Sequence, residues 1–145
     1  MKLTVKTKYG LSVLSQLSSE SLSAPVTGRL IASTQKISEP YVEQIMIPLI
    51  ASGIVRTIRG SKGGYMLNKD SSNITLLDII EAYEGKLDFS SIDESDKTTT
   101  SLQSCKGKKV WKFLEESIKS IAFGMTLDVM IKKFINNSKE GEYII

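Results

Sequence analysis

The 145-residue sequence contains no histidine and a single cysteine, and each shortage excludes a class of chemistry. Without histidine, the chain cannot form a Ser-His-Asp or Cys-His nucleophile system, and it has no histidine ligand for a metal. One cysteine cannot form an internal disulfide, which is typical of a cytoplasmic protein. We therefore expect a cytoplasmic protein that is not an enzyme and holds no metal.

Long apolar runs are also missing. No stretch reaches the roughly 20 apolar residues that a membrane-spanning helix needs, and the N-terminal MKLTVKTKYG lacks the apolar centre of a signal peptide. The glycine-rich segment after Gly60 does not have the spacing of a phosphate-binding P-loop, and a strand is expected after it instead of a helix. The sequence therefore predicts neither a membrane span nor a nucleotide site of that type.

Charge is unevenly distributed, although the net charge is only +3. Residues 1–69 carry nine Lys/Arg and three Asp/Glu, residues 70–104 carry two and eight, and residues 105–145 carry eight and five. A basic N-terminal half is what contact with phosphate requires. A lysine-rich solvated surface would give the same balance, so the elements that carry the charges decide between the two interpretations.

A helix with clear end signals is expected in the middle of the chain. Ser38 is a candidate N-cap, and Pro40 lies in the first turn, where its missing N–H costs little. The buried stripe is expected at Ile45, Leu49 and Ala51. Gly53 can adopt the left-handed conformation that ends the helix. Pro48 conflicts with this pattern, because proline inside a helix costs about 3 kcal/mol, so we predict a kink or an early break near Met46–Ile47.

A short basic hairpin should follow this helix. Residues 54–58 are rich in β-branched side chains and residues 65–67 return as the second strand. The turn between them contains the cations Arg59 and Lys62 and the glycines Gly60, Gly63 and Gly64, of which the last two should permit a tight hairpin. A helix followed by such a hairpin is typical of a winged helix-turn-helix, in which the helix enters the DNA major groove and the hairpin reaches the backbone or the adjacent minor groove.

Three further helices are expected. The first covers residues 5–19, with its apolar stripe at Val5, Tyr9, Val13, Leu14 and Leu17. The second begins at Thr27 and packs through Leu30, Ile31 and Ala32. The third begins at a capping box formed by Thr75 and Asp78, and Gly85 ends it. Lys2, Lys6 and Lys8 are either a solubilising face or phosphate contacts at the edge of a DNA surface.

The C-terminal part should contain a polar, flexible loop at residues 86–104 and then two helices. In the first of these helices, apolar residues repeat at helical spacing: Val110, Trp111, Leu114, Ile118 and Ile121. This face needs a cover, either a second copy of the chain or the chain's own domain. The last helix follows Thr126, with its stripe at Leu127, Met130, Ile131, Phe134 and Ile135, and packs on the winged domain or across to a partner.

Four motifs, in order and at the right spacing, carry a resemblance to a known family: SEPYVEQI, LIASGIV, IRGSKGGYML and ITLLDIIEAYEG. They resemble the Rrf family of bacterial winged-helix transcription regulators, whose best-known members are the iron–sulfur assembly regulator, the nitric-oxide sensor and the cysteine-metabolism repressor. The similarity begins at Leu3 and extends, more weakly, to about Val129. It covers most of the chain, and it implies that the helix containing Trp111 serves for dimerisation.

The resemblance also implies which residues contact DNA, because the family uses the start of the recognition helix and the wing. The matching positions in this chain are Ser38, Tyr41, Gln44 and Arg59. Glutamine can bond a base edge, hydroxyls can hold phosphate, and arginine can enter a narrow minor groove. Arg56 and Lys62 are further candidates for phosphate contact.

Cys105 is similar in position to the last of three cysteines that iron–sulfur members of the family place before the dimerisation helix. The other two are missing, and no histidine can replace them. Such a cluster is therefore not expected. Cys105 is instead a candidate redox switch, because nearby lysines and a helix N-terminus favour the thiolate. The alternative is a cysteine without a function, either buried or left from an ancestral cluster.

The sequence thus predicts a mainly α protein with a small β-hairpin wing: a winged helix-turn-helix domain at residues 1–85, a loop at 86–104, and dimerisation and C-terminal helices at 105–145. The function expected is that of a dimeric transcription regulator, more specifically a repressor, bound to a pseudo-palindromic operator in double-stranded DNA. Its signal would be thiol chemistry at Cys105 or a small molecule between the winged domain and the dimerisation helix. The alternative is a winged-helix module that binds proteins and not DNA.

Overall fold

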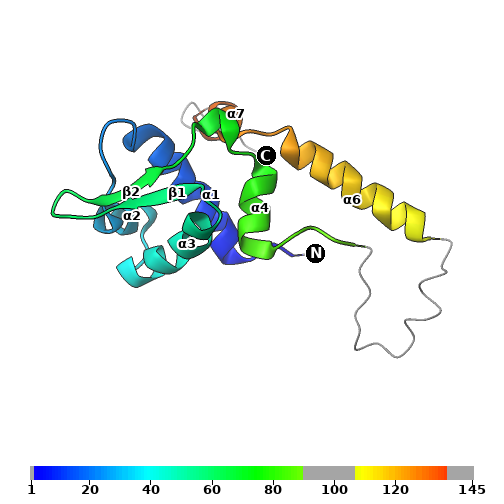
Figure 1. Cartoon of the computed structure of the whole chain (residues 1–145), viewed down its shortest axis with the longest axis horizontal. Helices are drawn as coiled ribbons and strands as arrows, with labels where there is room; N and C mark the ends of the chain where they lie inside the picture. Colours follow the sequence, from blue (N-terminus) through cyan, green and yellow to red (C-terminus); the bar gives the residue numbers. More distant parts are fainter. Residues whose placement is uncertain (1, 90–106, 137–145) are drawn as a thin grey trace.

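The computed structural model describes residues 2–89 and 107–136 and shows a mainly helical protein with one two-stranded hairpin (Figure 1). Cys105 and most of the expected loop lie outside the described residues. The elements are α1 (Val5–Glu20), α2 (Gly28–Gln35), α3 (Glu39–Ala51), β1 (Val55–Ile58), β2 (Gly64–Leu67), η1 (Ser71–Asn73), α4 (Leu76–Glu84), α6 (Lys108–Phe123), α7 (Leu127–Met130) and the π-helical turn η2 (Ile131–Ile135). The predicted fold class is confirmed.

Helix α1 buries a face that differs from the predicted stripe at its N-terminal end. Val13, Leu14 and Leu17 are fully buried, whereas Val5 is exposed. A strict four-residue spacing drifts by about 40° per step in a helix with 3.6 residues per turn, so Val5 lies about 120° around the helix from Leu17. The close approach of α1 to the core is made instead at Gly10, which is buried.

Helix α2 begins where expected, because the Thr27 hydroxyl accepts the Leu30 N–H at 3.1 Å. Ile31 and Ala32 are buried, but Leu30 is exposed, so its predicted packing role is wrong. Leu30 lies in the first turn, one residue before the buried pair, which rotates it by about 100° away from the core. The turn to α3 contains Lys36, whose φ of 59° makes it the one non-glycine residue with positive φ in the described ranges.

Helix α3 is the predicted recognition helix, and its first residues are capped as expected. The Ser38 hydroxyl accepts the Tyr41 N–H at 3.2 Å. The buried side chains are Val42, Ile45, Met46 and Leu49, whereas Ala51 is exposed. After the C-cap, Gly53 has a φ of +77°, the left-handed conformation that ends the helix.

Pro48 does not break α3, so the predicted early break near Met46–Ile47 is wrong. The helix continues to Ala51 with Pro48 inside it. Proline removes only the bond that its own N–H would have made to the carbonyl of Gln44. Leu49, the next residue, is fully buried, and this packing holds the helical path beyond the proline, as tertiary contacts often override local preference.

The wing is an antiparallel hairpin in which Val55 pairs with Leu67 and Ile58 pairs with Gly64. Val26, in the segment before α2, extends its base, because Val26 and Tyr65 exchange two backbone hydrogen bonds of 2.9 and 2.8 Å. The hairpin is therefore anchored to the helical part of the domain along β2, and its tip projects from the end of the molecule.

Helix α4 closes the core of the winged domain. Thr75 and Asp78 form the predicted capping box, with both bonds at 3.0 Å. The C-terminal α7 packs back on this domain: the Leu127 N–H donates to the Ile74 carbonyl at 2.8 Å, and Leu127 is fully buried. The last helix thus covers its own winged domain, although Phe134, predicted on its buried stripe, is exposed.

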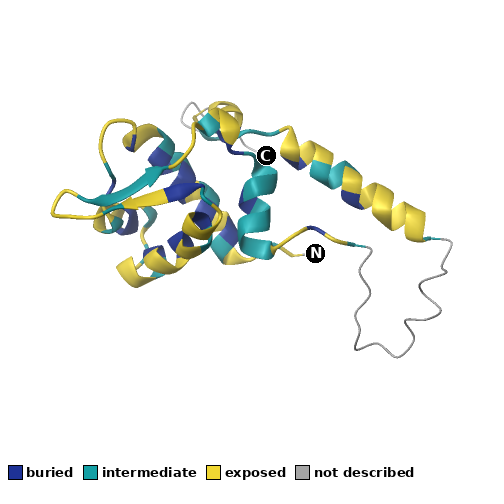
Figure 2. Cartoon of the chain, in the orientation of Figure 1, coloured by how far each residue is buried: buried dark blue, intermediate teal, exposed yellow. Residues whose placement is uncertain are grey.

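Helix α6 extends away from the winged domain (Figure 1), and much of its length is exposed (Figure 2). Its exposed residues include the apolar side chains Val110, Trp111, Phe113, Leu114, Ile121 and Phe123. It contacts α4, and its Glu115 carboxylate accepts the Phe89 N–H at 2.8 Å. Its only buried residues among those described are Glu115 and Ala122. In the described residues, no helix is long and apolar enough to cross a membrane.

Candidate nucleic-acid interface

The predicted DNA-contacting residues of α3 lie at its N-terminal end. Ser38 and Gln44 are exposed, whereas Tyr41 is half-buried. The Tyr41 ring packs edge-to-face on Tyr9 of α1, with ring centroids 5.8 Å apart. Tyr41 therefore has a packing role in addition to the phosphate contact predicted for it, while Gln44 stands clear of the core. A hydroxyl can accept one bond and donate another, so Ser38 can cap the helix and still donate to a phosphate.

The three cations of the wing are all exposed: Arg56, Arg59 and Lys62. Arg56 lies on β1 and reaches across the hairpin, with its Nη2 3.9 Å from the sulfur of Met66. Arg59 is the first residue after β1, so it stands at the start of the turn. These positions place two cations at the tip and one on the outer surface of the strand, where a phosphate backbone can approach them.

The glycines of the wing tip fit conformations or spaces that other residues would not. Gly60 has a φ of +113°, in the left-handed region. A Cβ at Gly63 would overlap the carbonyl oxygen of Ile58, and one at Gly64 would overlap the carbonyl oxygen of Val26. The tight turn and its attachment to the helical domain therefore depend on these residues.

The wing and α3 belong to the same end of the molecule, and α6 lies at the other end of its long axis (Figure 1). Helix α3 leads into β1 through a turn in which the Ile54 N–H donates to the Leu49 carbonyl at 3.0 Å. Gln44 and Arg59 are both exposed and neither is turned into the core. The arrangement can present a helix to a groove and a cationic hairpin beside it.

The face is not uniformly basic. Glu39 and Glu43 are exposed on α3, and these carboxylates would lie toward DNA phosphates if the helix entered a groove. Burial of the Tyr65 ring raises the pKa of its phenol, and the negative charge of Glu43 raises it further. Glu43 therefore lies near Tyr65 of β2, and helix α3 contributes exposed carboxylates and no lysine or arginine to this face.

A brace behind the recognition helix was not predicted from the sequence. The Tyr83 hydroxyl, on α4, donates to the Ile45 carbonyl of α3 at 2.7 Å. Its ring crosses α1 at Gly10, where an added Cβ would overlap the ring. Burial raises the pKa of the Tyr83 phenol, and the neighbouring Tyr41 adds to the shift. A glycine inside a helical pattern is the one sequence signal that could have indicated such a close approach.

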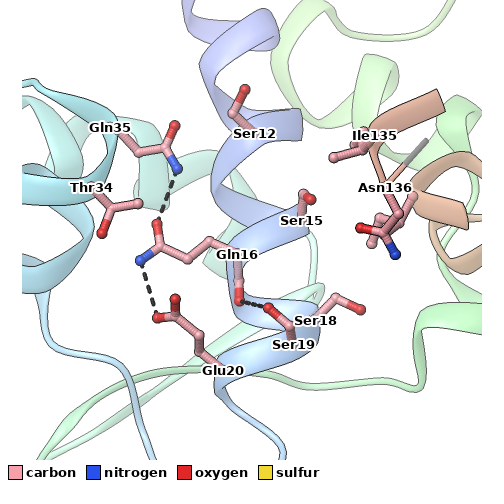
Figure 3. A pocket seen from close by; sticks show the side chains of 11 residues that line it. Ser12, Ser15, Gln16, Ser18, Ser19, Glu20, Thr34, Gln35, Ile135 and Asn136 are labelled. Carbon is pink, nitrogen blue, oxygen red and sulfur yellow. Dashed lines mark hydrogen bonds between the residues drawn. The ribbon is translucent and has the colours of Figure 1, made fainter. Parts of the chain in front are cut away.

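A polar groove lies on another side of the domain, between α1, the end of α2 and η2 (Figure 3). It has a volume of about 480 Å³. Gln16, which is buried, donates to Glu20 at 3.2 Å and accepts from Gln35 at 3.0 Å, so its amide joins α1 to α2. Ile131 and Ile135 line the groove from η2. The small-molecule pocket was predicted beside the dimerisation helix, and α6 contributes no residue to this groove.

The predicted dimerisation residues lie together on α6. Four of them are exposed, with Ile121 at 66%, Val110 at 61%, Trp111 at 53% and Leu114 at 41%, and Ile118 is half-buried. On a helix with 3.6 residues per turn these five positions fall within about 100° of the circumference. They form one continuous apolar stripe, which the described part of this chain leaves uncovered.

The fold, together with the surface formed by α3 and the wing, defines the class of protein. It is a winged helix-turn-helix protein that acts as a DNA-binding transcriptional regulator. A family profile described as "Rrf2: Iron-dependent Transcriptional regulator" matches residues 3–133. The chain belongs to the Rrf2 family, as the motifs predicted. The function of its relatives is regulation and not catalysis, so the expectation that it is not an enzyme is confirmed.

Curated relatives and solved structures agree. The transcriptional regulator CymR of Bacillus subtilis is 30% identical over 128 residues, which is 88% of this chain and 88% of that protein. IscR of Klebsiella pneumoniae is 31% identical over 144 residues, covering 99% of this chain and 80% of that protein. The structure of B. subtilis CymR, titled the global cysteine regulator, matches with a TM-score of 0.72 at 29% identity, over 91% of this chain and 97% of that one.

A second structure, T. potens IscR, matches with a TM-score of 0.68 at 31% identity, over 100% of this chain and 93% of that one. The predicted alternative, a module that binds proteins and not DNA, has no support among these relatives.

The residues of this chain do not fit the iron that the family description names. The sequence has one cysteine and no histidine, and within the described ranges no three His, Cys, Asp or Glu residues are grouped for a metal.

Proposed function

We propose that this regulator binds a pseudo-palindromic operator as a homodimer, with the start of α3 in the major groove and the wing on the adjacent backbone and minor groove. The observation that supports this most is the separation of two surfaces: an exposed helix with a cationic hairpin at one end, and at the other an apolar stripe on α6 that the described residues leave exposed. A two-fold dimer would present two recognition helices about 34–36 Å apart, one DNA turn.

Each contact has a proposed role. Gln44 bonds a base edge, and Ser38 and the Tyr41 hydroxyl hold phosphate. Arg59 enters the minor groove, where the negative potential is concentrated, and Arg56 and Lys62 bind phosphate. The wing supplies the charge, because α3 itself contributes Glu39 and Glu43. As a DNA-binding regulator of bacterial type, the protein would act in the cytoplasm, and we propose repression as its mode.

The signal is proposed to be either thiol chemistry at Cys105 or a small polar molecule. One solved relative, 26% identical, is Staphylococcus aureus CymR in an oxidized form, and this supports the redox route. For the second route, the groove of Figure 3 offers hydroxyl, amide and carboxylate groups beside an apolar wall. If the redox route is correct, oxidant should weaken DNA binding by the wild type and leave Cys105→Ser unaffected; equal loss in both proteins would remove it.

Salt dependence tests the proposed DNA contact. If cations of the wing neutralise phosphates, the logarithm of the binding constant should fall linearly with the logarithm of the salt concentration. The slope should be about −0.9 for each phosphate contacted. The titration uses an operator duplex obtained by selection, at several salt concentrations. Lys62→Ala should reduce the magnitude of the slope by about 1 for each wing engaged. A flat salt response of the wild type would contradict the proposed interface.

A further inference from the structure

The outer surface of α3 carries an isoleucine, Ile47, that has no role in the DNA contacts proposed above. Ile47 is 64% exposed, although Ile45 and Met46, directly before it, are buried. At about 100° per residue, four residues of α3 point most directly away from that buried face. They are Pro40, Gln44, Ile47 and Ala51. The helix therefore offers an apolar side chain on the same outer stripe as its predicted base-reading glutamine.

The spacing sets where Ile47 would lie in a groove. It follows Gln44 by three residues, which is about 4.5 Å along the helix axis and about 60° around it. Successive base pairs of duplex DNA are about 3.4 Å apart. When Gln44 meets one base edge, Ile47 is therefore next to a neighbouring base pair. Ile50, which is also exposed, is rotated by about 120° from Gln44 and faces the side of the helix.

We propose that Ile47 is a specificity-determining residue, which packs on the C5-methyl group of a thymine next to the base pair contacted by Gln44. This inference rests on the proposed placement of α3 in the major groove. Thymine is the one base with a methyl group on that edge. An isoleucine side chain has no donor or acceptor, so it gains from covering a methyl group and leaves the cytosine amino group without a partner.

The test removes a single methyl group from the DNA. Uracil pairs as thymine does and lacks only the C5-methyl group, so the thymines of a selected operator are replaced by uracil one at a time. At fixed salt, one such replacement in a single half-site should weaken wild-type binding by about fourfold, the effect of leaving one methyl group uncovered, and the same replacement in both half-sites should weaken it by about fifteenfold. Ile47→Ala should bind the thymine and uracil duplexes equally, and Ile47→Val should retain part of the difference.

Ile50→Ala is the matched control, because it shortens an exposed isoleucine of the same helix and should keep the full uracil penalty. The inference is overturned if no uracil position weakens wild-type binding, if Ile47→Ala keeps the uracil penalty, or if Ile50→Ala loses it as Ile47→Ala does. Failure of the proposed function looks different: the wild type would then bind no selected duplex at all. Thermal unfolding of both variants should match the wild type, since neither side chain is buried.

Discussion

The winged domain buries many of its large apolar side chains, whereas helix α6 leaves many of its own exposed. In α3, Val42, Ile45 and Leu49 are fully buried within one chain, whereas in α6 Phe113, Ile121 and Phe123 are 71%, 66% and 67% exposed. Apolar surface that stays in water forgoes about 25 cal/mol for each Å². The first region packs its apolar side chains within a single chain, whereas the second keeps apolar side chains exposed that no described residue of this chain covers.

This comparison separates two kinds of mutational effect. Changes on α6 should affect assembly and leave the winged fold intact, and changes at the wing should affect DNA and leave assembly intact. Changes at the brace between α1, α3 and α4 should lower the free energy of unfolding of the winged domain itself. The predictions below test that separation, from the largest expected effect to the smallest.

Leu114→Asp should have the largest effect, because Leu114 lies at the centre of the α6 stripe. A carboxylate buried without a partner in an interface typically costs about 3 kcal/mol or more, so association should weaken by a factor of about a hundred or more. Sedimentation equilibrium measures this. Lys112→Asp, on the opposite side of α6 and also exposed, is the control and should stay associated. A Leu114→Asp protein that associates like the wild type would show that this stripe is not the interface.

Arg59→Ala should weaken operator binding by more than tenfold, a loss of more than about 1.4 kcal/mol, because a bound dimer would lose two arginines from the minor groove, where negative potential is concentrated. A gel-shift titration at fixed salt provides the measurement, and sedimentation should show that the assembly is unchanged. Lys132→Ala removes an exposed charge on η2, far from the wing in sequence, and should bind as the wild type does. Unchanged binding by Arg59→Ala would remove the wing from the interface.

Gly10→Ala should destabilise the winged domain by about 1–3 kcal/mol, the usual effect of forcing a methyl group into filled space. The added Cβ would overlap the ring of Tyr83. Gly28→Ala is matched to it, because a Cβ at Gly28 would meet the Tyr65 ring at 3.5 Å, an ordinary contact. Urea unfolding compares the two. Equal stability of Gly10→Ala and the wild type would mean that Tyr83 does not pass over α1 as described.

Tyr83→Phe should have the smallest effect, a loss of about 1 kcal/mol of unfolding free energy, because it removes one hydrogen bond and leaves the buried Ile45 carbonyl without that donor. Tyr9→Phe keeps the edge-to-face contact with Tyr41 and should change stability by less than about 0.5 kcal/mol. Chemical unfolding again distinguishes them. If both substitutions have the same effect, the Tyr83 hydroxyl does not brace α3.

The sequence could predict what depends on local signals. The caps at Ser38, Thr27 and Thr75 are side-chain bonds to residues three positions ahead, so short motifs define them. The glycine at position 53 likewise predicts the left-handed conformation found there. With these ends fixed, the order of the helices and the hairpin follows, and this order is enough to predict the winged architecture.

Contacts between distant segments could not be predicted in the same way. The bond from Tyr83 to Ile45 joins residues 38 positions apart, and nothing in either local sequence indicates it. The early break expected at Pro48 was wrong because the local cost of proline was considered without the burial of Leu49. Val5 was misplaced by a four-residue spacing that drifts around the helix. The residues on the outer stripe of α3 could be identified only after the structure had shown which face of that helix is buried.

Selection of bound sequences from a random DNA pool tests the central claim most directly. If two winged domains present α3 and the wing to one duplex, the enriched sequences should form an inverted repeat with half-sites about 10–10.5 base pairs apart. Enrichment of a single unrepeated motif, or of no motif, would contradict the account.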